Sequence, residues 1–113
     1  MVSITTFRQK AISFPDTIEL PHFDRASFRV SKKIFCTLLE KEGLVMVKLS
    51  LDDQSVFCAF DKRVIYPVPG GWGRQGATYI ELKKVKKTML FDAMTVAYCT
   101  VAPKKLAEKY LCK

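Results

Sequence analysis

Residues 17–49 read TIELPHFDRASFRVSKKIFCTLLEKEGLVMVKL, and this stretch decides the fold class. Four runs rich in β-branched and aromatic residues alternate with short polar connections. The runs lie at 17–20, 27–30, 34–39 and 44–49. Connections of so few residues join neighbouring antiparallel strands. The stretch therefore predicts a β-meander, and the run ATYIEL at 77–82 predicts one further strand.

Helical patterns flank the meander on both sides. The first pattern consists of Ile4, Phe7, Ala11 and Phe14, and the longest of Leu90, Met94, Ala97, Tyr98 and Val101. A capping pattern at 50–53 predicts the start of another helix, and Pro103 suits the first turn of a short last one. We therefore predict an α+β two-layer sandwich: an antiparallel meander with helices packed on one face and the other face partly open.

Composition favours one domain over residues 1–113. Apolar residues make up 49% and charged residues 27%, which is typical of a globular chain. No apolar run is long enough to span a membrane, and no signal-peptide pattern follows the first basic residues. The four cysteines are scattered without a C-x-x-C pair, which indicates reduced thiols. We expect a cytoplasmic monomer that has no membrane association.

Positive charge is concentrated in the last third of the chain. The formal net charge is +8, and residues 83–113 contain eight lysines against Asp92 and Glu108. Such a field attracts polyanions or acidic surfaces at long range, although basic charge also serves solubility.

The stretch PVPGGWGRQG at 67–76 holds four of the five glycines and is expected to interrupt regular structure completely. It resembles the signature loop of the MmcQ/YjbR family. Further fragments match that family in order along nearly the whole chain: Pro21-His22-Phe23, residues 27–30, Lys33-Ile34-Phe35, Lys48-Leu49-Ser50, Asp53-Gln54 and residues 101–106. One departure is Lys32, which stands where members often have a glycine, so the hairpin turn must be looser or adopt a positive φ.

The resemblance implies a fold of the frataxin/CyaY class, in which two β-hairpin wings flank helices. Family members are described as double-wing DNA-binding proteins, and this description implies a similar partner here. The chain would then be a non-enzymatic, weakly sequence-selective DNA-binding protein that mainly contacts phosphates, with duplex DNA favoured over RNA.

The candidate binding residues fall into three groups. They are Trp72 and Arg74 of the loop; Arg29, Lys32, Lys33 and Lys48 on or near the hairpins; and Lys83, Lys84, Lys86, Lys87, Lys104 and Lys105. A tryptophan stacks on bases, a guanidinium grips phosphate in bidentate fashion, and lysines follow a phosphate backbone. The hairpin cations are expected to share the non-core face of the sheet. Each group also has a purely structural interpretation, as a loop anchor or a solvated surface.

Alternative functions have less support in the sequence. The 67–76 loop and the open sheet face also suit an acidic protein or a small phosphorylated ligand. A third possibility, a small enzyme relying on His22 and Arg74, lacks any activating motif for a nucleophile. The first helix offers Arg8 and Lys10 but no carboxylate, so no metal or other cofactor is expected.

Overall fold

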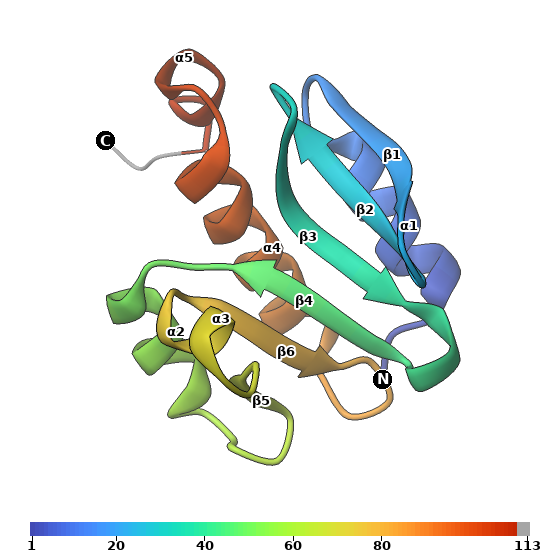
Figure 1. Cartoon of the computed structure of the whole chain (residues 1–113), viewed down its shortest axis with the longest axis vertical. Coiled ribbons are helices and arrows are strands. Elements are labelled where there is room, and N and C mark those ends of the chain that lie inside the picture. The colour runs from blue at the N-terminus through green and yellow to red at the C-terminus, as the bar shows by residue number, and fades with distance from the viewer. Residues whose placement is uncertain (111–113) are drawn as a thin grey trace.

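The computed structural model describes residues 1–110, which form a six-stranded antiparallel sheet in the order β1-β2-β3-β4-β6-β5 (Figure 1). The strands are β1 (Thr17–His22), β2 (Arg25–Val30), β3 (Lys33–Leu39), β4 (Leu44–Lys48), β5 (Ile65–Pro67) and β6 (Ala77–Glu81). A single 3-10 turn, η1 (Glu40–Glu42), joins β3 to β4. The predicted meander and the α+β class are confirmed.

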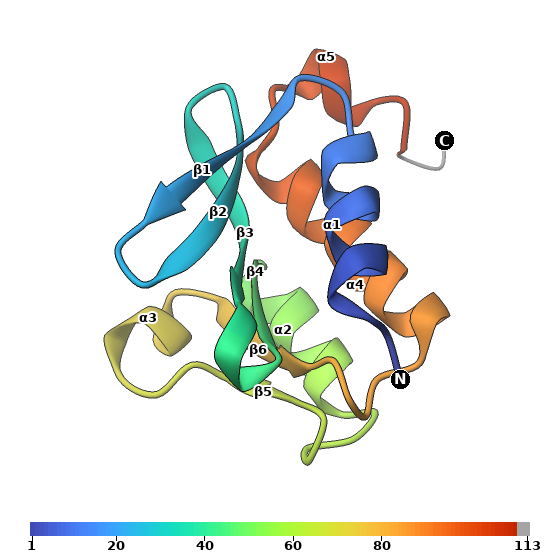
Figure 2. The ribbon, with the colours of Figure 1, turned by 90° about the vertical axis from the view of Figure 1, so that its right-hand side faces the viewer.

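Most of the helices cover one face of the sheet. They are α1 (Ile4–Ser13), α2 (Leu51–Cys58), α4 (Lys87–Val101) and α5 (Lys104–Ala107). Figure 2 shows α1 and α4 side by side on one side of the strands, while the short helix α3 (Gly71–Arg74) projects on the other. We call the side that carries α3 the open face.

The predicted capping pattern of α2 is confirmed. Ser50 Oγ accepts from the backbone N–H of Asp53 at 3.1 Å, which satisfies one of the free donors of the first turn. Apolar residues follow this cap at helical spacing, but only Phe57 among them is buried, whereas Val56 and Phe60 are exposed.

The core lies between the sheet and α1 and α4, and aromatic rings fill its centre. Phe14 stacks on Tyr98 with ring centroids 4.8 Å apart, and Phe35 meets both rings edge-on. The ladder between β2 and β3 shifts register between Phe28 and Arg29, which places the consecutive residues Phe35 and Cys36 both in the core. After this bulge, Thr37 and Leu39 point to the open face.

The turn at Lys32, where glycine is absent, is tight and has a positive φ instead of being looser. Val30 pairs with Lys33, so Ser31 and Lys32 alone form the turn, with φ of 50° and 70°. Positive φ at both central residues is the geometry that matches the twist of a two-residue hairpin.

The glycine-rich stretch is more regular than the sequence predicted. Residues 65–67 form strand β5 against β6, and Gly71–Arg74 form one turn of helix. The prediction that regular structure stops completely here was wrong, because Pro67 pairs with Thr78 at the edge of β6 and the Arg74 N–H donates to the Gly70 carbonyl to close a helical turn.

Candidate functional site

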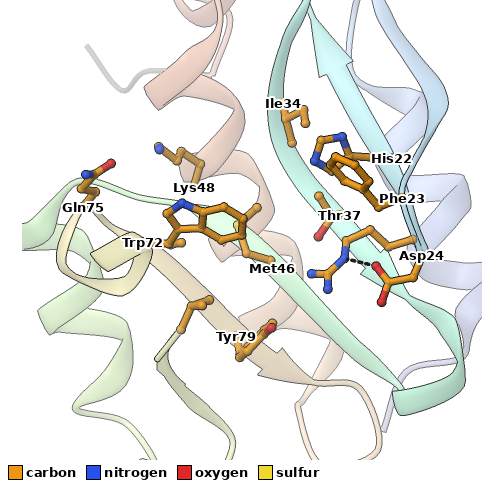
Figure 3. A pocket seen from close by; sticks show the side chains of 13 residues that line it. His22, Phe23, Asp24, Ile34, Thr37, Met46, Lys48, Trp72, Gln75 and Tyr79 are labelled. Carbon is orange, nitrogen blue, oxygen red and sulfur yellow. Dashed lines mark hydrogen bonds and ion pairs between the residues drawn. The ribbon is translucent and has the colours of Figure 1, made fainter. Parts of the chain in front are cut away.

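A groove of about 300 Å³ lies on the open face, between the tip of the β1–β2 hairpin and α3 (Figure 3). Trp72 stands on one side and His22 and Phe23 on the other, with Thr37, Met46 and Tyr79 between them. We call it the open-face groove. Its lining residues are His22, Phe23, Asp24, Arg25, Ile34, Thr37, Met46, Lys48, Val68, Trp72, Gln75, Ala77 and Tyr79.

The floor of the groove follows from strand alternation. Met46 pairs with Tyr79 across β4 and β6, and Lys48 pairs with Ala77. Val45 and Val47, which alternate with these residues on β4, point to the core. The floor is therefore one continuous row of side chains from neighbouring strands, held by the same ladder that builds the sheet.

Trp72 is held at the rim with 70% of its surface exposed. Its neighbour Gly73 lies against the backbone of Val68, where an added Cβ would come within 1.8 Å of the carbonyl oxygen. Gln54, buried on α2, places Nε2 2.9 Å from the Gly73 carbonyl and 3.1 Å from that of Ala77. Trp72 therefore sits on an anchored turn, and its ring is free for a partner.

Positive charge dominates the groove. Arg25 and Lys48 line it, and Asp24 is the one acidic residue in the lining. Arg25 Nε donates to Asp24 Oδ1 at 3.1 Å, the bond drawn as a dashed line in Figure 3, and this bond is the main cause of the lowered pKa of Asp24. Among residues 1–110, no carboxylate lies within salt-bridge distance of Lys48.

The hairpin tip presents Phe23 to solvent. The turn has only Phe23 and Asp24 between the paired residues His22 and Arg25. Phe23 has φ of 59° and is 95% exposed. The His22 ring contacts it edge-on at a centroid distance of 4.7 Å.

Only two of the predicted binding residues, Trp72 and Lys48, line the groove. Arg29 lies on the same face of β2, where its Nε donates to Ser27 Oγ at 3.0 Å. Arg74 is exposed on α3 outside the groove lining. Lys33 pairs with Val30, whose side chain is in the core, so it lies on the helix-covered face, and Lys32 forms the turn. The hairpin cations therefore do not all share one face.

The remaining predicted lysines are divided between the two ends of α4 (Figure 1). Lys83, Lys84, Lys86 and Lys87 precede or begin this helix, and Lys104 and Lys105 lie in α5 beyond its other end. At 1.5 Å per residue, the 15 residues of α4 separate the two sets by roughly 22 Å. Lys84 is also paired with Glu81 at 3.3 Å. Folding does not gather these lysines with Trp72.

Sequence reasoning missed Arg25, Phe23 and Tyr79 as groove residues. Residues 24 and 25 were assigned to a connection between strands, whereas β1 and β2 run up to a two-residue tip. The identity of Phe23 in a turn was the available signal, since turns favour glycine, asparagine and aspartate.

The cysteine thiols and the possible metal ligands are the remaining reactive groups of the described residues. Burial raises the pKa of the Cys36 thiol well above its ordinary value, and burial also raises the pKa of Cys58 and Cys99. Within residues 1–110, no three His, Cys, Asp or Glu side chains cluster in a way that holds a metal ion. No helix there is long and apolar enough to cross a membrane.

Comparisons with known proteins give a match in structure alone. No family model and no curated protein sequence matches the chain. The crystal structure of Deinococcus radiodurans protein DR2400, whose domain is described as DUF419, is similar with a TM-score of 0.79 and 13% identity. The match covers 100% of this chain and 84% of that one. DUF419 is the MmcQ/YjbR family. The resemblance to that family is therefore confirmed at the level of the fold.

Proposed function

We propose that this chain is a non-enzymatic nucleic-acid-binding protein that holds a single strand, DNA in the first instance, in the open-face groove. The observation that carries the proposal is the meeting of Trp72, Arg25 and Lys48 on one groove with a single, already paired carboxylate. Proteins that bind single strands combine a positive groove with aromatic rings on which bases stack. The formal net charge of +8 supports the same partner at long range.

A single strand fits the geometry better than the duplex that the sequence favoured. Stacking on Trp72 needs a base whose flat side is free, and bases in a duplex are already stacked on one another. The lysine sets that would track a duplex lie at opposite ends of α4, on elements other than those that form the groove. That these lysines add to binding stays a prediction. It is tested by comparing Lys105→Glu with the same charge change at Lys48.

Salt dependence follows from the two groove cations. Each phosphate neutralised on a single strand lowers the slope of log K against log salt by about 0.7. With Arg25 and Lys48 engaged, we expect a slope of about −1.4. Loss of stacking on Trp72 should cost about 1–3 kcal/mol, which is roughly 5- to 150-fold in affinity.

The test is fluorescence anisotropy of a labelled oligothymidylate against the full chain, with a duplex of similar length in parallel. Trp72→Ala and Lys48→Glu should each weaken binding of the single strand. Lys105→Glu is the matched control, because it makes the same charge change on α5 and should have a smaller effect. The groove would be refuted as the binding site if the affinity did not change with salt concentration, or if Lys48→Glu and Lys105→Glu lowered the affinity equally.

A small phosphorylated ligand is the second candidate, and the size of the groove favours it. A space of about 300 Å³ bordered by Trp72 and Lys48 also suits one nucleotide, with its ring on the indole and its phosphate on the ammonium. A thermal shift with millimolar mononucleotide that Trp72→Ala abolishes, without measurable oligonucleotide binding, would favour this function.

A protein partner is supported by exposed apolar residues at the edge of the same face, and the groove cations Arg25 and Lys48 favour an acidic one. Ile18 and Leu20 pair with Arg29 and Ser27, so they point to the open face of the edge strand β1, where they are 54% and 40% exposed. A protein partner would cover these residues as well as the groove. Ile18→Ala would then weaken capture of that partner while leaving oligonucleotide binding unchanged.

A further inference from the structure

The tip of the β1–β2 hairpin has a residue that folding alone does not explain. Phe23 occupies the first position of a two-residue turn with φ of 59°, where glycine is the usual residue. A large side chain is strained in this conformation. The ring is 95% exposed, so burial within residues 1–110 does not offset the strain. Strain that persists without a packing reason points to a functional use.

The surroundings of Phe23 place it in the open-face groove. Its ring faces the groove from the hairpin side, and Trp72 faces it from the other side (Figure 3). The His22 ring contacts it edge-on, with the two ring centroids 4.7 Å apart. Arg25, fixed by Asp24 at 3.1 Å, lies two residues further along the same hairpin. An aromatic face and a phosphate-binding group therefore come from one two-residue turn and the residue after it.

We infer that Phe23 is a stacking wedge, which separates one base of a bound single strand from the next while Trp72 holds its own base across the groove. This inference rests on the proposed function and adds a second aromatic contact to it. Exposed apolar side chains that insert between bases interrupt base stacking in this way. Arg25 would bind the phosphate between the two separated bases, because its guanidinium retains donors beyond the one given to Asp24.

The decisive variant is Phe23→Gly, because it separates binding from folding. Glycine adopts positive φ without strain, so the variant should melt at the wild-type temperature or above it. Removal of the ring should weaken oligothymidylate binding about tenfold. Phe23→Tyr keeps an aromatic face and should bind like the wild type. Phe60→Ala is the matched control, since it removes an exposed phenylalanine that lies outside the groove lining.

Fluorescence of 2-aminopurine within the oligonucleotide reports the wedge directly. Wild-type protein should change the emission of a reporter base whose stacking on its neighbour is interrupted, and Phe23→Gly should remove that change. If Phe23→Gly binds like the wild type while Trp72→Ala does not, the wedge is wrong and the proposed function stands. If Phe23→Gly lowers the melting temperature, the ring serves folding and the wedge is wrong. If no oligonucleotide binds the wild type, the proposed function fails and the wedge with it.

Discussion

Replacement of Gly76 by alanine should destabilise the protein strongly, because this glycine meets two separate constraints. Its φ is 107°, a conformation that side-chain-bearing residues rarely adopt, and an added Cβ would lie 1.8 Å from the Leu49 carbonyl oxygen. The backbone strain costs about 1–3 kcal/mol. Relief of the clash requires movement away from Leu49, which breaks the 3.1 Å bond from Leu49 N to Gly76 O. That loss adds about 0.5–1.5 kcal/mol.

The total cost of about 1.5–4.5 kcal/mol converts directly into a melting temperature. A chain of 113 residues has an unfolding entropy of about 0.24 kcal/mol/K at the midpoint, so Gly76→Ala should melt roughly 6–19 °C below the wild type by calorimetry. Gly71→Ala is the control, since nothing lies within 4 Å of its added Cβ and its φ is outside the positive region. It should melt within about 4 °C of the wild type. Similar melting temperatures for the two variants would refute this reasoning.

Two further predictions concern the hairpin turn and an acid-sensitive hydrogen bond. Changing Ser31 to Asn and Lys32 to Gly should raise the melting temperature by about 4 °C, because residues suited to φ of 50° and 70° relieve about 1 kcal/mol of strain. An unchanged melting temperature would contradict this prediction. The Tyr66 hydroxyl donates to Glu81 at 2.6 Å, and this bond is the main cause of the lowered pKa of Glu81. A lowered folded-state pKa gives stability that is present above the ordinary pKa of 4.5 and lost as the pH falls below it. Tyr66→Phe should therefore melt below the wild type at pH 7, and the difference should shrink in acid; a constant difference would exclude this linkage.

The sequence predicted most of the elements because their signals are local. Ser50 followed by Asp53 marks the start of α2 by the same hydrogen bond that the structure contains. Apolar residues at helical spacing fix the buried side of α4, where Leu90, Met94 and Tyr98 are all in the core. Such signals depend on a few neighbouring residues and hold whatever the rest of the chain does.

Features that depend on pairing between distant residues escaped the sequence. The bulge that turns both Phe35 and Cys36 inward depends on how β2 aligns with β3, and it decides which of the following residues face the groove. Strand β5 exists because residues 65–67 reach the free edge of β6. Neither alignment is visible in a single segment, so neither the bulge nor β5 could be predicted.

The candidate site was predictable only where a residue type was unusual for its place. Trp72 among glycines stood out, and it lies at the rim of the groove. Arg25 did not, because nothing in residues 24–25 shows that the hairpin tip lies opposite α3. The groove combines residues from β1, β2, β3, β4, β6 and α3, and their meeting depends on the order of strands in the sheet.

Clustering of charge along the sequence does not identify the cations that line the groove, whereas the arrangement of strands does. Four lysines within residues 83–87 look like a binding patch, but they lie where β6 leads into α4, and one of them is paired with Glu81. Arg25 and Lys48 are single cations far apart in the chain, yet pairing of β2 with β3 and of β3 with β4 brings them to one groove. Lys48 lies in the same groove as the exposed ring of Trp72, so one ligand can contact both, whereas Lys105 on α5 lies outside that groove. For this reason a single change at Lys48 should matter more than the same change at Lys105.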